Sequence, residues 1–476
     1  MAEAALATGG TWLAQPLPLD TPLKGGSSDT RAMAGAGIFF ALPGGRADGH
    51  DFLPRLAGSS ARLAVVSREA PFPQFEGNVL RVAGGLEALG RMAAFLVQKH
   101  RPRIVAITGS YGKTTAKEVI AHVLAGRHKV LKTPGSHNNE LGLPLALLDL
   151  DGSQDITVLE FSARREGDIA YLGRIAPPDV AVLLAVGRAH IGVFGSQEAI
   201  YRAKGEIFAC LKPGGLAVTG AENPRLRELA GEHRTLTFGR DEGDFRAEQV
   251  TADARGRQRF TGVHRERRVA FRAGMSGAHG LYPLLAAWAV AGELGVPDQE
   301  VAARGEFDPA QKGRSLLRDA PGGALLLDDT YNASPATVNN LIASLASLDG
   351  DEKILVLGHL SELEEGLAES AELIGGALTG VLAHCYVYAP ASPGLAGRLA
   401  GLARACKVRE FSTQQELIAA LREADRPGKV IGIKGARAAH MERIVQGMLG
   451  SEITCELETC ELLMSCTDCD EMTRTV

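Results

Sequence analysis

A buried strand that runs directly into a glycine-containing loop and then into a helix constrains this chain more than any other feature. The run Arg103-Ile104-Val105-Ala106-Ile107-Thr108 is apolar enough for a buried strand, and residues 114–124 have a helical pattern. The loop between them reads Gly109-Ser110-Tyr111-Gly112-Lys113-Thr114-Thr115. In this order of elements, backbone N–H groups and a helix N-terminus point toward a bound anion. The segment therefore predicts an α/β fold with a phosphate-binding loop.

The residue types of this loop match the needs of a nucleoside triphosphate. Gly109 and Gly112 allow the backbone to turn its N–H groups toward a phosphate. Lys113 supplies a cation for the β and γ oxygens, and the Thr114 hydroxyl can ligate Mg2+. The spacing departs from the usual loop, whose first glycine would fall at Ile107. Nucleotide binding is the interpretation that we carry forward, and a structural turn is the alternative.

Three further residues near the expected sheet edge carry groups that phosphoryl transfer uses. Transfer needs a metal-binding acid at the end of a neighbouring strand, and Glu160 ends the apolar run 156–160. His190 follows the strand expected at 180–186, and Lys204 lies within one helix of it. A lone histidine or lysine is usually structural or solvated. His190 and Lys204 therefore indicate a catalytic site only in combination with the phosphate-binding loop.

The alternation of strand and helix patterns divides the chain into three domains, as its length of 476 residues also favours. Residues 1–98 combine short apolar strands with glycine-rich turns and end in a helical pattern, which indicates a small α/β domain. Residues 99–306 indicate a parallel sheet covered on both faces, with an antiparallel insertion at 250–272. Residues 307–450 indicate a second doubly wound, Rossmann-like sheet.

The last segment, residues 451–476, differs from the rest in composition. It carries seven acids, one arginine and four of the chain's seven cysteines, which are Cys455, Cys460, Cys466 and Cys469. We expect an acidic tail of this kind to be disordered unless a metal or a partner holds it. The last two cysteines form one Cys-x-x-Cys, but the spacing of the four is irregular for a zinc knuckle. Metal binding and a disordered or redox-sensitive appendage both stay open.

Composition excludes several classes of protein. The chain is 45% hydrophobic and 22% charged, and no apolar run approaches the roughly 20 residues that span a bilayer. Residues 1–10 lack the basic and apolar pattern of a secretory signal. A net charge of -5 with few aromatic residues argues against a nucleic-acid partner. We expect a soluble, cytoplasmic monomer that has small-molecule partners and binds neither nucleic acid nor membranes.

Several segments, in order along the chain, resemble motifs of the Mur ligases, the ATP-dependent enzymes that build the peptide of bacterial cell-wall precursors. The resemblance covers residues from about 28 to 449. Residues 29–31 and 44–52 are similar to the family's uridine-nucleotide site, which would make the first domain a uridine-nucleotide domain. Residues 133–142, which contain Asn138 and Asn139, are similar to its asparagine loop near the phosphates and the substrate.

The remaining motifs follow the phosphate-binding loop. Residues 189–196 and 203–207 resemble the segment whose histidine binds the second Mg2+ and whose lysine is carbamylated. Residues 312–314 and 327–335 resemble the hinge arginine and the ribose-binding aspartate of the third domain. Residues 434–443 resemble the family's final motif, with Ala436 where a serine is usual.

The resemblance implies a role for each matching residue. ATP binding falls to Gly109, Ser110, Tyr111, Gly112, Lys113, Thr114, Thr115, Arg314, Asp329 and Asn332. Two Mg2+ ions would be held by Thr114, Glu160, His190 and Lys204, with Lys204 carbamylated and therefore anionic. Catalysis falls to Lys113, His190 and Lys204. The UDP-muramoyl-peptide substrate would contact Asp29, Thr30, Arg31, Asp48, His50, Asn138, Asn139, Lys434 and Arg437.

The implied activity is formation of an amide bond through an acyl phosphate, with D-alanyl-D-alanine or another amino compound joined to a UDP-muramoyl-tripeptide. Three departures bear on it. Residues 277–283 lack two asparagines that lie near the adenine in relatives, and Ala185 replaces another asparagine. Residues 358–364 replace a glycine-aspartate-methionine pattern in a loop that receives the incoming amine. Three alternatives therefore stay open: a paralogous ligase with a different acceptor, a P-loop kinase or NTPase, and a non-catalytic nucleotide-binding protein.

Overall fold

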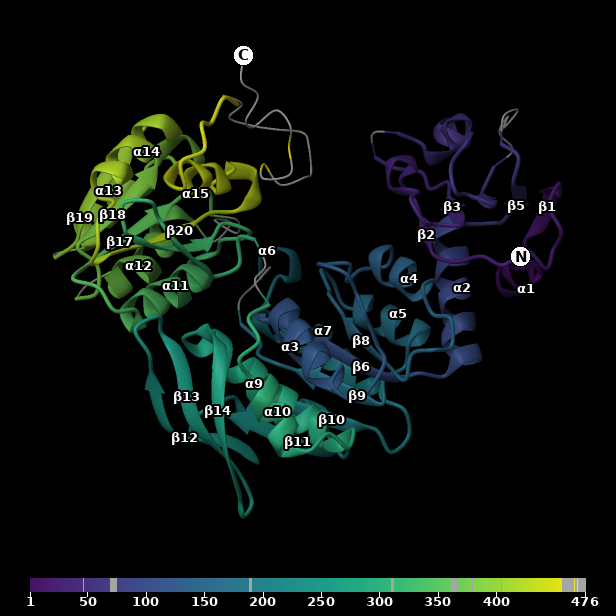
Figure 1. The fold of residues 1–476 in the computed structure, drawn as a ribbon, viewed down its shortest axis with the longest axis horizontal. Helices are drawn as coiled ribbons and strands as arrows, with labels where there is room; N and C mark the ends of the chain where they lie inside the picture. The colour runs from purple at the N-terminus through teal and green to yellow at the C-terminus, as the bar shows by residue number, and fades with distance from the viewer. Residues whose placement is uncertain are drawn as a thin grey trace.

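Three separate β-sheets divide the chain in the computed structural model of the protein (Figure 1). The structure describes residues 1–45, 47–68, 75–187, 191–309, 312–360, 366–378, 380–403, 405–455, 466 and 469, with backbone alone at 278, 279 and 336. The predicted α/β class with three domains is therefore confirmed. Each sheet falls inside one of the ranges 1–98, 99–306 and 307–450. Those boundaries themselves, and the disorder of the tail, stay predictions.

The N-terminal domain is a five-stranded sheet in the order β1-β5-β4-β3-β2, parallel except for the pairing of β1 with β5. Its long helix α2 packs against α1 on one side and against α4 and α5 of the central domain on the other. This helix therefore joins the first two domains. The elements are α1 (Ala2–Thr8), β1 (Thr11–Ala14), β2 (Gly26–Ser27), β3 (Ile38–Phe40), β4 (Leu63–Val66), β5 (Asn78–Arg81), α2 (Gly85–His100), and the 3-10 helices Thr30–Ala32 and Gly49–Leu56.

The central domain is a nine-stranded sheet in the order β14-β13-β12-β11-β10-β9-β6-β8-β7. The strands from β6 to β12 pair in parallel, and β12, β13 and β14 form the antiparallel extension that the alternating pattern predicted. The strands are β6 (Arg103–Thr108), β7 (Val130–Lys132), β8 (Ile156–Glu160), β9 (Val180–Leu183), β10 (Leu216–Gly220), β11 (Arg234–Gly239), β12 (Phe245–Ala252), β13 (Arg257–His264) and β14 (Arg267–Ser276). The helices are α3 (Lys113–Leu124), α4 (Gly142–Leu147), α5 (Asp168–Ile175), α6 (Ile191–Phe194), α7 (Gln197–Ala209), α8 (Pro224–Ala230), α9 (Ala278–Glu293) and α10 (Asp298–Arg304).

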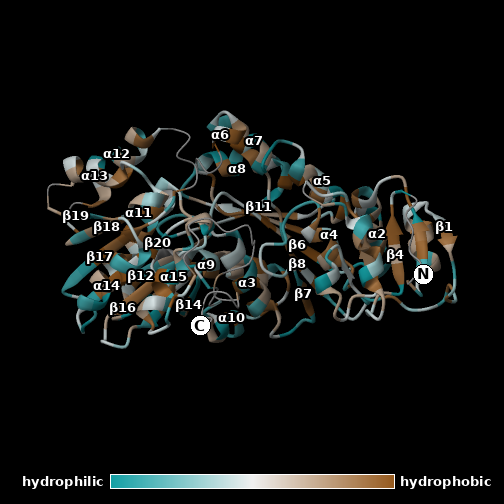
Figure 2. Cartoon of the chain, turned by 90° about the horizontal axis from the view of Figure 1, so that it is seen from above, coloured by the Kyte–Doolittle hydropathy of each residue, from teal (hydrophilic) through white to brown (hydrophobic). Residues whose placement is uncertain are grey.

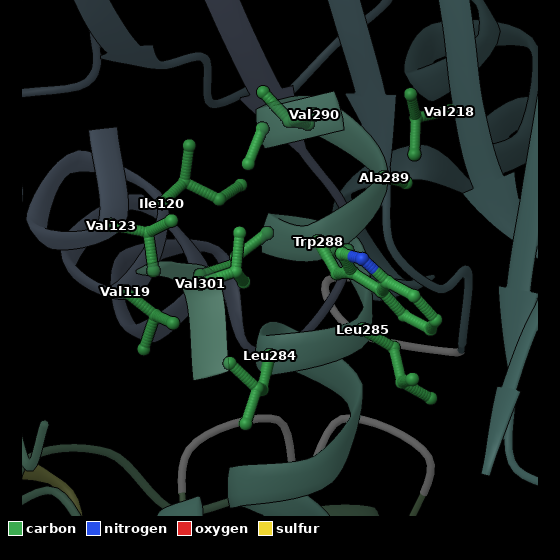
Figure 3. Packing of buried hydrophobic residues seen from close by; sticks show 14 of the residues in the cluster. Val119, Ile120, Val123, Val218, Leu284, Leu285, Trp288, Ala289, Val290 and Val301 are labelled. Atoms are coloured by element: carbon green, nitrogen blue, oxygen red, sulfur yellow. The ribbon is translucent and has the colours of Figure 1, made fainter. Parts of the chain in front are cut away.

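Helix α9 packs along α3 and fixes the position of the helix that follows the phosphate-binding loop (Figure 3). Trp288 of α9 is fully buried and lies among the aliphatic side chains of this cluster, which include Ile120 and Val123 of α3. Its Nε1 donates a hydrogen bond of 2.7 Å to Oδ1 of Asp298, so burial leaves no polar atom of the ring unpaired. A helix held this tightly provides a rigid base for the loop.

The third domain is a six-stranded sheet in the order β15-β16-β20-β17-β18-β19, parallel except for β15. Helices α11, α12 and α13 pack with one cluster of buried side chains, and α14 and α15 pack with the other. This is the doubly wound sheet that the sequence predicted. The elements are β15 (Leu316–Asp319), β16 (Leu325–Asp329), α11 (Pro335–Ser347), β17 (Glu352–Leu357), α12 (Leu367–Leu378), β18 (His384–Tyr388), α13 (Leu395–Leu402), β19 (Lys407–Phe411), α14 (Gln414–Glu423), β20 (Lys429–Lys434), α15 (Glu442–Met448), and the 3-10 helices Ala389–Ala391 and Arg437–Ala439.

The first and third domains lie at opposite ends of the molecule, with the central domain between them (Figure 1). Seen from above, strands such as β4 and β17 carry the hydrophobic colour inside each domain (Figure 2). The third domain also meets the turn between β12 and β13, where Arg255 and Asp319 form an ion pair at 2.7 Å. Across the described ranges, every helix is too short or too polar to span a bilayer.

Candidate active site

The loop after β6 contains two glycines in backbone conformations that other residues rarely adopt. Gly109 has a φ of +154° and Gly112 a φ of +75°. A Cβ atom on Gly109 would lie 3.1 Å from the carbonyl oxygen of Ala185. Gly112 is the N-cap residue of α3, and no side chain caps the first N–H groups of that helix. These N–H groups are therefore available to an anion, as the sequence predicted.

Lys113 is the first residue of α3 and folds back over the loop. Its Nζ donates to the carbonyl oxygens of Gly109, at 2.9 Å, and Ser110, at 3.5 Å. Burial lowers the pKa of Lys113, while Glu160 raises it and Arg314 lowers it. The electrostatic influence of Glu160 and Arg314 means that β8 and the third domain both approach this lysine.

Ser110 ties the loop to the segment that follows β9. Its backbone N donates to the carbonyl oxygen of Ala185 at 2.7 Å, and its Oγ accepts from the backbone N of Gly187 at 3.0 Å. A Cβ atom on Gly187 would lie 2.5 Å from the ring of Tyr111. We expected a strand through 186, but β9 ends at Leu183 because β6, its partner, ends at the paired Thr108.

His190 lies outside the described residues, so its predicted role as a metal ligand and catalytic residue stays a prediction. Thr114 is buried in the first turn of α3, where Thr115 follows it.

Glu160 lies at the end of β8 with only 1% of its surface exposed. Nδ2 of Asn138 donates to Oε1 of Glu160 at 2.8 Å, and the backbone N of Glu160 donates to Oγ1 of Thr133 at 3.2 Å. Within the described part of the chain, the buried Oε2 of Glu160 has no hydrogen-bond partner. A buried carboxylate oxygen without a donor is unfavourable, and a hard cation such as Mg2+ would satisfy it. The residues present therefore fit the metal that the sequence implied.

Lys204, on α7, is 3% exposed and lies close enough to Lys113 and Glu160 for both to act on its charge. The pKa of Lys204 is lowered to about 7: burial is the largest cause, Lys113 also lowers it, and Asp168, Glu160 and Glu206 partly oppose the shift. A large part of this amine is therefore uncharged at neutral pH, and an uncharged amine is the form that reacts with carbon dioxide.

The sequence analysis missed Lys117, which is fully buried on α3. Its Nζ donates to the carbonyl oxygens of Thr133 and Gly135, both at 2.7 Å, and pairs with Glu118 at 3.0 Å. Lys117 thus ties α3 to the loop that carries Asn138. The signal in the sequence was its position four residues after Lys113, which places both lysines on one side of a helix.

Tyr331 of the third domain lies against the asparagine loop of the central domain. Its hydroxyl lies 3.2 Å from Oγ of Ser136, and the same Oγ accepts a hydrogen bond of 3.2 Å from Arg314. The guanidinium groups of Arg314 and Arg437 lie 4.0 Å and 5.5 Å from the centre of the Tyr331 ring. Tyr331 therefore supports two of the predicted arginines, and sequence reasoning gave it no role.

Asp329 and Lys434 lie side by side at the ends of β16 and β20. Nζ of Lys434 pairs with Oδ2 of Asp329 and donates to the carbonyl oxygen of Asn332 at 2.9 Å. Oδ1 of Asp329 accepts from the backbone N of Ser315 at 3.2 Å. Lys434 is only 2% exposed, so the structure brings this predicted substrate residue to the predicted ribose aspartate.

The predicted uridine residues form a separate group in the N-terminal domain, where the two 3-10 helices lie in contact. Asp29 accepts hydrogen bonds from the backbone N and the side chain of Arg31, and Thr30 lies in the turn between them. Hydrogen bonds from the backbone and then the ring of His50 lower the pKa of Asp48 to about 2. These residues belong to the first domain, whereas Lys113 belongs to the central domain.

The structure explains the residue found at two positions that the sequence singled out. Oδ1 of Asn139 accepts hydrogen bonds from the backbone N of Gly142, at 2.9 Å, and of Leu141, at 3.4 Å, so this side chain supports the start of α4. At Gly280, where the resemblance implied an asparagine, a Cβ atom would lie 2.5 Å from the carbonyl oxygen of Met275. The backbone at this point therefore leaves no room for a side chain.

Comparison with known proteins identifies the family. The sequence matches the Mur ligase middle domain over residues 107–291 and the Mur ligase glutamate ligase domain over residues 313–437. A Bacillus subtilis UDP-N-acetylmuramoyl-tripeptide--D-alanyl-D-alanine ligase is 30% identical over 449 residues, covering 93% of this chain and 96% of that protein. The Mycobacterium tuberculosis ligase of the same name is 33% identical over 375 residues, covering 73% of this chain and 74% of that protein.

Solved structures agree with this result. A crystal structure of MurF from Acinetobacter baumannii has a TM-score of 0.83 at 29% identity and covers 94% of this chain and 98% of its own. MurF ligase from Thermotoga maritima in complex with ADP has a TM-score of 0.78 at 30% identity. The match covers 90% of this chain and 97% of that one. The chain therefore belongs to the Mur ligases of the MurF type, which are ATP-dependent, ADP-forming acid–amino-acid ligases.

Proposed function

We propose that this protein joins D-alanyl-D-alanine to UDP-N-acetylmuramoyl-tripeptide in the synthesis of peptidoglycan precursors. The observation that carries the proposal is the convergence of Lys113, Glu160, Lys204 and Arg314 from four separate elements on one site. A simple P-loop kinase or NTPase has no need of a buried lysine at 204 or of an arginine from a third domain. The names of the relatives above support the choice of substrates.

The chemical problem is that an unactivated carboxylate resists attack by an amine. We infer that the carboxylate of the tripeptide attacks the γ-phosphorus of ATP, which forms an acyl phosphate and releases ADP. The amine of D-alanyl-D-alanine then attacks the acyl carbon, and the tetrahedral intermediate loses phosphate and a proton to give the amide. The balance is one ATP consumed for each amide bond formed.

Residues of this chain would act on the two charged groups of that reaction. Lys113 would lie against the β and γ oxygens, and the first N–H groups of α3 would bind the phosphates. Arg314 would add a second cation from the third domain, held in place by Tyr331. We assign ribose binding to Asp329, with Asn332 beside it, and substrate contacts to Lys434 and Arg437. The uridine group would be bound by Asp29, Thr30, Arg31, Asp48 and His50, and the peptide end by Asn138 and Asn139.

Metal binding is assigned to Thr114, Glu160, His190 and Lys204. Mg2+ bound there would neutralise charge on the transferring phosphoryl group and on the carboxylate. We infer two ions and a carbamylated Lys204, because the carbamate converts a buried cation into an anionic oxygen ligand. The reaction is balanced: the neutral amine adds carbon dioxide and releases one proton.

The test is ADP release by purified protein given ATP, Mg2+ and UDP-N-acetylmuramoyl-tripeptide, with and without D-alanyl-D-alanine. We expect sustained turnover only when both substrates are present, and a fall of about 10²- to 10³-fold in Lys113→Ala because the cation on the phosphates is lost. When D-alanyl-D-alanine is omitted, hydroxylamine should take the place of the amine and trap the acyl phosphate as a hydroxamate. ADP release that needs only ATP would instead indicate an NTPase, and release with a different amine would indicate a ligase with another acceptor.

A further inference from the structure

The structure places a cysteine of the C-terminal tail beside two buried side chains that the ligase chemistry does not use. Cys466 Sγ lies 3.1 Å from Nδ1 of His440, and the backbone N of Cys466 donates to Oε1 of Glu442 at 3.1 Å. Nδ1 of His440 lies 3.8 Å from Oε1 of Glu442. One ligand atom from each of the three residues lies within 4.8 Å of the others, and all three residues are buried.

Two buried polar atoms of this cluster are unsatisfied. Nε2 of His440 and Oε2 of Glu442 are buried and have no hydrogen-bond partner among the described residues. His440 is 4% exposed and Glu442 is 7% exposed, so solvent cannot satisfy these atoms easily. His440 also has a φ of +48°, a left-handed conformation that is uncommon for residues other than glycine. A metal ion that took Oε2 of Glu442 as a further ligand would offset the cost of that unpaired oxygen.

We propose that His440, Glu442 and Cys466 form a zinc site that fastens the C-terminal tail to the third domain. Imidazole, thiolate and carboxylate are the ligands that Zn2+ takes in proteins, whereas Mg2+ and Ca2+ prefer oxygen atoms alone. With Zn–S of about 2.3 Å and Zn–N of about 2.0 Å, a tetrahedral ion places sulfur and nitrogen about 3.5 Å apart. The observed separation of 3.1 Å needs only a small shift of side chains to reach that value.

The surrounding side chains bring the tail to this place. Arg443, at the start of α15, donates to Sγ of Cys466 at 3.3 Å and to Sγ of Cys455 at 3.2 Å. Arg443 therefore holds these two thiols of the tail against the start of α15. Cys466 is also followed by Cys469, whose backbone N donates to the carbonyl oxygen of Cys466 at 3.2 Å.

The location gives the site a structural role next to the substrate residues. His440 lies three residues after Arg437, on the segment that leads from Lys434 to α15. Zinc at His440 and Glu442 would therefore fasten the end of this segment to Cys466 of the tail. The ion is distinct from the Mg2+ assigned to Glu160, which lies in the central domain.

The test is zinc analysis of the untagged full-length protein after incubation with Zn2+ and removal of free metal. We expect about one zinc ion per chain, which excess Mg2+ does not displace, and at least about a tenfold loss of affinity in Cys466→Ser and in Glu442→Gln. Cys210→Ser, which changes a thiol in the central domain, is the matched control and should bind zinc normally. Cys466→Ser alters only the tail, so it keeps the test valid if a change in the third domain prevents folding.

A second measurement reports the ligand directly. Co2+ in place of Zn2+ should give a thiolate-to-cobalt charge-transfer band in the wild type and in Cys210→Ser, and no such band in Cys466→Ser. Less than about a tenth of an ion per chain, or zinc binding and a cobalt band that survive in Cys466→Ser, would overturn the proposal.

Discussion

Glu160, one of the proposed Mg2+ ligands of the central domain, accepts a hydrogen bond from Asn138, and both residues can be tested. Glu160→Gln keeps an oxygen that can accept the hydrogen bond from Asn138 but removes the charge. We expect at least a tenfold rise in the Mg2+ concentration needed for half-maximal activity. Asn138→Ala removes the side chain that donates a hydrogen bond to Oε1 of Glu160. We expect the affinity for Mg2+ to fall by about 10- to 100-fold.

The control for both variants is Glu166→Gln, because Glu166 is an exposed acid that pairs with Arg202 at 2.7 Å. An exposed pair of this kind contributes little, so Mg2+ dependence should not change. An unaltered Mg2+ requirement in Glu160→Gln would remove Glu160 from the metal site.

Lys204 allows a prediction about pH, because burial and the charge of Lys113 place its pKa at about 7. Below that pH the amine is protonated and does not react with carbon dioxide, and above it the neutral amine does. We therefore expect a carbamate resonance in 13C NMR with labelled bicarbonate, which weakens as the pH falls below 7. The resonance should vanish in Lys204→Ala. It should persist in the control variant Lys212→Ala, because Lys212 lies at the surface, where it pairs with Asp179.

A resonance that survives in Lys204→Ala would place the carbamate elsewhere. If the carbamate supports activity, the pH at which ADP release declines should match the pH at which the resonance declines.

At the scale of elements, helix α3 does more than present the phosphate-binding loop. Through Lys117 it also holds the carbonyl oxygens of Thr133 and Gly135, and thereby the loop of Asn138. Lys117→Met keeps the apolar length of the side chain but leaves those oxygens without their donor. Since hydrogen bonds to a charged group contribute about 1.5–3 kcal/mol each, we expect a destabilisation of a few kcal/mol and a raised Mg2+ requirement.

Urea unfolding followed by circular dichroism, together with Mg2+ titration of activity, measures both effects. Lys129→Met, at an exposed position directly before β7, is the control and should change neither. A stable Lys117→Met protein with normal Mg2+ dependence would mean that the loop holds its shape without this lysine.

The element patterns explain how far the sequence could predict the fold. The apolar run 156–160 located β8, because a strand buried on both faces is continuously hydrophobic. Helix α9 begins at Ala278 and continues through Pro283, so this proline does not mark the start of the helix. Weakly apolar edge strands such as β7 and β19 were missed, since half-exposed residues carry no clear pattern.

At the scale of the whole molecule, contacts of different kinds join the third domain to the central domain. Among them are the exposed ion pair of Arg255 with Asp319 and the contact of Tyr331 with Ser136. We expect Tyr331→Ala to lower kcat/KM by about 10²-fold, because Arg314 loses the ring that positions it. Tyr331→Phe removes only the hydroxyl and should cost much less.

Arg255→Ala is the matched control at the other contact. An exposed ion pair contributes about 0.2–1 kcal/mol, so this variant should stay within a few fold of wild type. Equal losses in Arg255→Ala and Tyr331→Ala would mean that the general docking of the domains matters, and not the position of Arg314.

Lys113 and Arg314 belong to different domains. We therefore predict that the third domain closes over the site when nucleotide and substrate bind. We expect small-angle X-ray scattering to report a more compact particle with nucleotide and UDP-muramoyl-tripeptide than without them, because closure excludes water from the acyl phosphate. Identical scattering profiles in the two states would contradict closure.

The sequence by itself determined the α/β class, the three sheets, the phosphate-binding loop and the family, because these depend on local patterns of apolar residues, glycines and short motifs. Only the tertiary structure decided which distant side chains meet. Lys117, Tyr331 and the pairing of Cys466 with His440 acquire their roles from residues 16, 195 and 26 positions away in the chain. No local pattern encodes such contacts, since packing between elements and domains brings them together.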